Sequence, residues 1–145
     1  MYKRILLPTD GSEATRRAVA YGIGFARAIG AGVVAMTVSA PVRLVAADGE
    51  MPIGTADQYA AACRRAAQRL LDEVRAQAQA AGLDCSAVQI VSDDVHEAIL
   101  RAAREHGCDL ILMASHGRRG FKALMPGSVT QKVLVHSTIP VLVYR

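Results

Sequence analysis

Short apolar runs alternate with longer segments of helical periodicity along this 145-residue sequence, and this alternation restricts the possible folds more than any other feature. Five runs are short and apolar enough to be buried strands. They span residues 5–7, 33–38, 87–91, 110–113 and 141–143. Strands separated by helices form parallel sheets with helices on both faces and right-handed crossovers. The sequence therefore predicts a single α/β domain, residues 1–145, with a doubly wound, five-stranded parallel sheet.

Four segments between these strands have apolar residues at every third or fourth position, which is typical of amphipathic helices. They span residues 13–29, 56–81, 95–106 and 128–136. Ser12 is the expected N-cap of the first helix, with Glu13 favourable beside it, and Gly30 is its expected end. Residues 40–55 have no sustained period and predict one long loop.

The composition supports a packed core, because 52% of the residues are hydrophobic and 21% are charged, a balance that excludes a disordered chain. The apolar stretch at residues 33–42 has about half of the ~20 residues that a membrane-spanning helix needs. The first apolar run has three residues, too few for a signal peptide. We therefore expect a cytoplasmic protein without a membrane segment.

The cysteines and histidines are dispersed. Cys63, Cys85 and Cys108 cannot form a local metal or redox pair, and the histidines at positions 96, 106, 116 and 136 form no i, i+4 pair for zinc. We predict reduced thiols and no structural metal.

The net charge of +4 is concentrated in residues 101–145, which carry +5, whereas residues 1–100 carry −1. A local basic region favours a small anionic ligand. Nucleic-acid binders more often have a broad basic face with aromatic residues, but only 4% of these residues are aromatic. We therefore expect no nucleic-acid partner.

A polar, glycine-containing segment follows the fourth predicted strand. Ala114-Ser115-His116-Gly117 is followed after nine residues by Gly127-Ser128, where the last predicted helix begins. Glycines let the backbone approach an anion, and helix N-termini bind phosphate. The nearby residues that would add positive charge or hydroxyl donors are Arg118, Arg119, Lys122, Ser128 and Thr130. On spacing alone, the alternative stays open that the glycines only turn the chain and Ser128 only caps a helix.

A second polar turn, Thr9-Asp10-Gly11-Ser12, follows the first predicted strand. In doubly wound sheets, ligands bind outside the carboxyl ends of the strands, where the strand order reverses. A strand order of 3-2-1-4-5 would place this turn beside the segment after strand four.

At these residues the sequence resembles the universal stress protein family, in particular its ATP-binding branch, which is known by a G-x2-G-x9-G-[ST] pattern after the fourth strand. The matching residues are Ala114, Gly117, Gly127 and Ser128. Residues 3–12 and 127–143 also resemble the family, and the similarity covers essentially the whole chain. The resemblance implies a Rossmann-like fold.

The resemblance also implies that the chain binds ATP, with Mg²⁺ accompanying the nucleotide. Pro8, Thr9 and Asp10 would line the adenine and ribose side, and Val38 would contact the base. Met113 would also belong to the nucleotide site. The residues that would surround the ribose and phosphates are Ala114, Ser115, His116, Gly117, Arg118, Arg119, Gly120, Gly127, Ser128, Val129 and Thr130. It further implies a homodimer through the last strand, where Val141, Leu142 and Val143 would otherwise leave an apolar edge unpaired.

Two positions depart from the family pattern. Ala114 replaces the first glycine, which adds a methyl group and restricts φ. Asp93 and Asp94 stand where members of the family often carry a glycine, and two inward carboxylates would repel a triphosphate. We expect both to be exposed helix caps.

Covalent catalysis is not favoured. Asp10 lacks a second acidic residue two positions later, where Ser12 stands. Ser115 and His116 are expected to point in different directions along an extended backbone, without a third triad member. Because no water-activating base and no glycine-rich loop ending in Lys-Ser or Lys-Thr is found, we expect at most slow ATP hydrolysis.

The predicted function is therefore that of an ATP-binding, nucleotide-dependent module with a regulatory or protective role in stress. Two alternatives stay open. One is a nucleotide-free, dimeric interaction module in which Ala114 and Asp93 mark a degenerate site. The other is an enzyme of the same fold that transfers adenylyl or phosphoryl groups.

Overall fold

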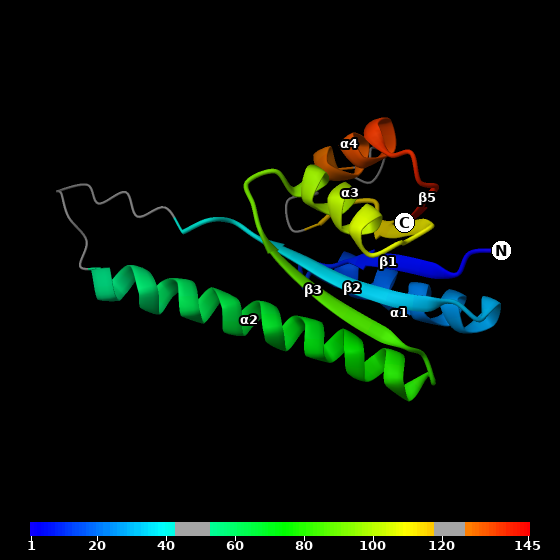
Figure 1. Cartoon of the computed structure of the whole chain (residues 1–145), viewed down its shortest axis with the longest axis horizontal. Coiled ribbons are helices and arrows are strands. Elements are labelled where there is room, and N and C mark those ends of the chain that lie inside the picture. The colour runs from blue at the N-terminus through cyan, green and yellow to red at the C-terminus, as the bar shows by residue number, and fades with distance from the viewer. Residues whose placement is uncertain (43–52, 118–126) are drawn as a thin grey trace.

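The computed structural model describes residues 1–42, 53–117 and 127–145, in which strands and helices alternate throughout (Figure 1). The strands are β1 (Arg4–Pro8), β2 (Gly32–Ser39), β3 (Cys85–Val91), β4 (Leu110–Ala114) and β5 (Val141–Tyr144). The helices are α1 (Glu13–Ile29), α2 (Ile53–Ala80), α3 (Val95–Glu105) and α4 (Ser128–His136).

The five strands form one parallel sheet in the order β3-β2-β1-β4-β5, which confirms the predicted fold class and strand order. Helices α1 and α2 pack on one face of the sheet and α3 and α4 on the other (Figure 1). Successive residues of β1 supply both cores, because Ile5 and Leu7 pack toward α1 and α2 whereas Leu6 packs toward α3 and α4. The continuous apolar run of this strand is explained by burial on both faces.

The boundaries differ from the prediction by more than one residue at two places. Helix α2 begins at Ile53 and not at residue 56, so the predicted loop at 40–55 is too long, and its residues 43–52 lie outside the described part. Strand β3 begins at Cys85, because Cys85 and Ser86 pair with Val33 and Val34 of β2. Pairing with the neighbouring strand therefore extends β3 beyond its apolar run.

The predicted helix ends are confirmed for α1. The amide of Thr15 donates to Ser12 Oγ at 3.3 Å, and Gly30 has a left-handed φ of 71°. Within residues 1–42, 53–117 and 127–145, no helix is both long and apolar enough to cross a bilayer.

Candidate functional site

A cleft opens at the carboxyl ends of β1, β2 and β4, where the strand order reverses between β1 and β4. Its inner cavity has a volume of about 130 Å³. An outer groove of about 1140 Å³ extends from it toward α2 and the N-terminus of α4. The two share several lining residues, among them Asp10, Val38 and Gly117, so they form one continuous cleft. The position is the one at which doubly wound sheets bind ligands.

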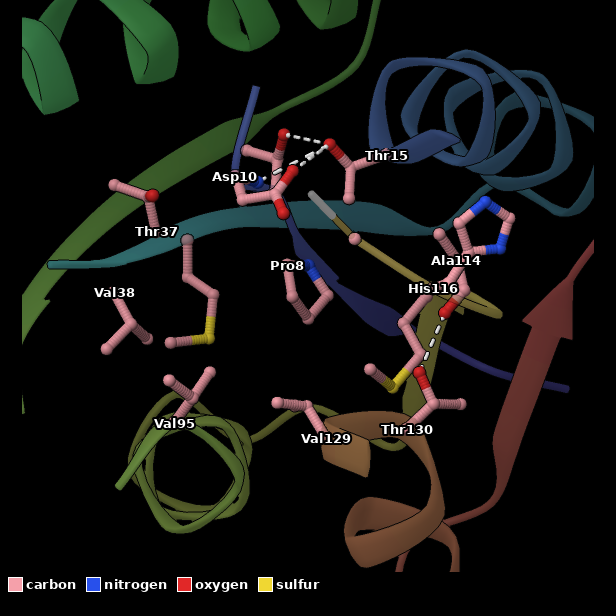
Figure 2. A pocket seen from close by; sticks show the side chains of 14 residues that line it. Pro8, Asp10, Thr15, Thr37, Val38, Val95, Ala114, His116, Val129 and Thr130 are labelled. Atoms are coloured by element: carbon pink, nitrogen blue, oxygen red, sulfur yellow. Dashed lines mark hydrogen bonds between the residues drawn. The ribbon is translucent and has the colours of Figure 1, made fainter. Parts of the chain in front are cut away.

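The inner cavity is lined by both apolar and polar residues. Its apolar lining residues are Pro8, Met36, Val38, Val95, Met113, Ala114 and Val129, and its threonine and aspartate residues are Thr9, Asp10, Thr15, Thr37 and Thr130. Figure 2 shows Asp10, Thr15 and Thr37 on one side of the pocket and Val95 and Val129 on the other. An apolar lining with a few polar groups is typical of a binding site for a small molecule.

The turn between β1 and α1 holds the Asp10 carboxylate in place. Asp10 Oδ1 accepts hydrogen bonds from the amide of Ser12 and from the hydroxyl of Thr15, each at 2.9 Å. The hydroxyl of Thr9 donates to Thr15 Oγ1 at 3.1 Å. Gly11 completes the turn with a left-handed φ of 78°, which favours glycine. Asp10 therefore accepts a hydrogen bond from a loop amide, that of Ser12.

The N-terminus of α4 packs directly on the end of β4. The amide of Gly127 donates to the carbonyl oxygen of Ser115 at 2.6 Å, and the hydroxyl of Thr130 donates to the carbonyl oxygen of Ala114 at 3.0 Å. A β-carbon on Gly127 would lie 3.4 Å from His116 Cα, an ordinary van der Waals contact, so the helix end lies close against the end of β4. This packing places Gly127 and Ser128 at the outer groove.

Among the described residues, this end of α4 has no side-chain cap. The N-cap residue is Gly127, which has no side chain that could accept a hydrogen bond from the first turn. The alternative that Ser128 merely caps the helix is therefore wrong, because Ser128 is its first residue. The first amides of a helix have no acceptor within it and carry partial positive charge. This helix end is suited to an anionic ligand group in the groove.

The loops after β1 and β4 are in contact, as predicted from the strand order. A β-carbon on Gly117 would collide with Asp10 Oδ2. A side chain at position 117 would therefore displace the neighbouring carboxylate or the loop.

Ser115 and His116 differ from the prediction. Their side chains do not point apart, because Ser115 Oγ lies 3.1 Å from His116 Nδ1. Strand β4 ends at Ala114, so the alternation of side chains no longer applies at Ser115. His116 lines the cleft, whereas Ser115 is 9% exposed and contributes to the lining of neither part. The pair therefore presents the imidazole, not the hydroxyl, to a ligand.

The prediction that Asp93 and Asp94 are both caps is correct for Asp94 alone. Asp94 Oδ1 accepts a hydrogen bond from the amide of Glu97 at 3.4 Å and caps α3. Asp93 precedes the cap and lines the outer groove. An exposed carboxylate therefore stands at the groove, because only the residue next to the helix can serve as its N-cap.

Most of the predicted site residues line this cleft. Those in the inner cavity are Pro8, Thr9, Asp10, Val38, Met113, Ala114, His116, Gly117, Val129 and Thr130, and those in the outer groove alone are Gly127 and Ser128. The predicted site residues Arg118, Arg119 and Gly120 lie outside the described part of the chain.

Sequence reasoning missed several lining residues. Those in the inner cavity are Thr15, Met36, Thr37 and Val95. The available signal for Met36 was its position two residues before Val38 on the same face of a strand. Helix α2 adds Tyr59, Cys63 and Leu70 to the outer groove, although the sequence indicated only a core-facing stripe there. A helical stripe does not reveal where the helix projects beyond the sheet.

Comparisons with known proteins show which family this chain and its fold resemble. Residues 1–145 match the sequence model of the universal stress protein family. A universal stress protein of Thermus aquaticus is 33% identical over 146 residues that cover all of both chains. The solved structure of MJ0577, from Methanocaldococcus jannaschii, is 27% identical with a TM-score of 0.82 over 99% of this chain and 95% of that chain. A universal stress protein in complex with cAMP is 26% identical, with a TM-score of 0.68 over 99% of this chain and 97% of that chain.

Proposed function

Because the chain belongs to the universal stress protein family, we propose that its cleft binds an adenine nucleotide, ATP with Mg²⁺ foremost, and that the bound nucleotide controls a regulatory or protective role in stress. One observation carries the proposal: the uncapped N-terminus of α4 adjoins a cavity with apolar lining residues. The relative that is bound to cAMP supports an adenine nucleotide as the ligand class.

In this proposal the two parts of the cleft bind different parts of the nucleotide. The base lies in the inner cavity against Pro8, Val38 and Met113, where apolar side chains can contact both faces of a ring. The phosphates lie in the outer groove at Gly127 and Ser128, where the helix amides and dipole favour negative charge. The sugar then lies between these two regions.

The described residues fit a magnesium ion that is held chiefly by the nucleotide. No three metal-ligating side chains cluster within residues 1–42, 53–117 and 127–145. Mg²⁺ commonly binds substrate phosphates and several waters with only one or two carboxylates. Asp10 and Asp93 are the carboxylates that line the cleft in this part of the chain. The ion would neutralise phosphate charge, and any hydrolysis is expected to be slow.

Calorimetric titration of nucleotide-stripped protein with Mg²⁺ and ATP tests the proposal. Ser128 is exposed and is the first residue of α4, so aspartate there suits the helix while repelling phosphates. We expect Ser128→Asp to weaken ATP binding by about tenfold or more, and the neutral Ser128→Asn to change it by less than about threefold. No detectable heat at millimolar ATP would refute ATP binding.

The nucleotide-free interaction module is retained as a second candidate. It is favoured by the Asp93 carboxylate at the groove and by Ala114 in place of the first glycine of the family pattern. The same titration separates the candidates, because this one requires that no adenine nucleotide binds.

We also propose a homodimer through β5. This strand is at the edge of the sheet, and Val141, Leu142 and Val143 are only half-buried. On the adjacent helix α4, Leu134 is 44% exposed and Val135 is 77% exposed. An apolar edge strand of this kind is a template for pairing with a second copy. Light scattering after size exclusion should give twice the monomer mass, and Val143→Lys should shift it toward the monomer.

A cytoplasmic location completes the proposal. The free thiols of Cys63, Cys85 and Cys108 are consistent with a reducing compartment.

A further inference from the structure

Thr37 differs from the other buried polar residues of the described chain. These residues are Thr9, Thr15, Thr37, Ser115 and Thr130, each at most 9% exposed. The hydroxyls of the other four make hydrogen bonds to protein atoms. Thr37 is 5% exposed, and its hydroxyl makes no hydrogen bond with any described residue.

A buried hydroxyl without a partner is unfavourable, and valine would fill the same space in a strand without that cost. No fully buried side-chain oxygen or nitrogen of the described residues lacks a partner. The oxygen of Thr37 must therefore open into the cleft, where Figure 2 shows this side chain at the edge of the pocket. Its partner is expected to be a ligand or the water that the ligand replaces.

The position of Thr37 indicates which part of a nucleotide it meets. Thr37 and Asp10 line both the inner cavity and the outer groove, so they stand at the junction of the two. With the base inside and the phosphates at α4, the group at this junction is the sugar.

The two side chains are complementary to a diol. The hydroxyl of Thr37 both donates and accepts, whereas an ionised carboxylate only accepts. Thr15 and the Ser12 amide fix the orientation of Asp10 through its Oδ1. From this arrangement we infer that Thr37 is a specificity-determining residue that hydrogen-bonds a sugar hydroxyl, so that the cleft selects ribonucleotides over deoxyribonucleotides. The inference rests on the proposed nucleotide function.

The test compares AMP with 2′-deoxy-AMP and 3′-deoxy-AMP on the full chain by calorimetry. Thr37→Val keeps the shape and removes the hydroxyl. We expect it to weaken AMP binding about three- to tenfold, the range for one neutral hydrogen bond. Thr37→Val should leave the affinity for one of the two deoxy analogues unchanged, because that analogue already lacks the sugar hydroxyl to which Thr37 would bind.

Two further variants separate ligand contact from structure. Thr37→Ser retains the hydroxyl and should retain the preference for AMP. Thr138→Val makes the same change at an exposed position outside the cleft and should have no effect.

The assignment is overturned if Thr37→Val weakens all three nucleotides by the same factor, or if it leaves AMP binding unchanged. Failure of the wild-type protein to bind any of the three refutes the proposed nucleotide function itself. Wild-type binding of all three with equal affinity refutes the role of Thr37 alone.

Discussion

The carboxylate of Asp10 occupies the space in which a β-carbon of residue 117 would lie, so Gly117 and Asp10 are packed against each other across the cleft. The contact joins the loops that follow β1 and β4, and each loop supplies part of the candidate site. The site therefore depends on the absence of a side chain at Gly117 and on the orientation of the Asp10 carboxylate.

We predict that Gly117→Ala lowers both stability and nucleotide affinity. Forcing an extra carbon into a packed contact costs about 1–3 kcal/mol, and here it must move either the loop or the carboxylate. Chemical denaturation and titration with AMP measure the two effects.

The double variant Asp10→Ala, Gly117→Ala serves as the control for this contact. Because it removes the collision, its loss of stability should be smaller than the sum of the single losses by about 0.5–3 kcal/mol. Additive losses would show that the two residues do not interact.

The second prediction concerns two glycines of α1, whose replacement by alanine should change the stability of the protein in opposite directions. A β-carbon on Gly22 would lie 2.6 Å from Leu7 Cδ2, whereas one on Gly24 would meet nothing within 4 Å. Gly24→Ala should therefore stabilise the protein by up to about 1 kcal/mol through helix propensity. Gly22→Ala gains the same propensity but overpacks the core, and should be net destabilising by about 1–2 kcal/mol.

Urea denaturation of the two variants measures this difference. A more stable Gly22→Ala protein would mean that Leu7 moves aside without cost.

The fold was predictable because each strand and helix has its own local pattern, and the strand order followed from placing the two polar turns together. The site was less predictable. Thr37 lies within an apolar strand, and only the packing around it reveals that its hydroxyl opens to the cleft. The direction of Ser115 depended on where β4 ends, and the local sequence did not reveal that end. Asp93 and Asp94 have the same side chain, and the first residue of α3 decides which of them is the cap.

Asp109 gives a pH-dependent prediction. Its carboxylate accepts hydrogen bonds from the amides of Lys3 and Arg4, at 2.9 and 3.0 Å for the shortest of each, and so holds the start of β1. Partial burial raises the pKa of Asp109, but these backbone hydrogen bonds and the charge of Lys3 outweigh it and lower the pKa below the usual 3.8. The stabilisation is thus fully present above the unfolded-state pKa and is lost as the pH falls through the lower folded-state pKa.

Asp109→Asn should consequently destabilise the protein at pH 7 by at most about 1–2 kcal/mol, because solvent weakens the interactions of the exposed part of the side chain. The difference between variant and wild type should shrink below about pH 4. Urea denaturation between pH 3 and pH 7 measures it, with Asp57→Asn at an exposed position of α2 as the control. A difference that stays constant over this range would contradict the role of the ionised carboxylate.

The cysteines allow the cleft to be tested without changing any residue. Cys108 is 5% exposed, and burial raises its pKa to about 11, with Arg4 lowering it and Asp109 raising it to smaller extents. Only about one Cys108 thiol in a thousand is then ionised at pH 8, and the thiolate is the reactive form. Cys108 should be alkylated by iodoacetamide much more slowly than the partly exposed Cys63.

Cys63 lines the outer groove, whereas Cys85 begins β3 at the opposite end of the sheet. A nucleotide in the groove should therefore slow the alkylation of Cys63 by about fivefold or more when the site is nearly saturated. The reason is that the fraction of sites occupied by nucleotide sets the fraction of Cys63 thiols that are protected. Cys85 should react at the same rate with and without nucleotide and so serves as an internal control. Mass spectrometry of the alkylated peptides over time measures each rate. Equal protection of Cys63 and Cys85 would indicate a general stabilisation of the fold, and no protection at saturating ATP would place the ligand away from α2.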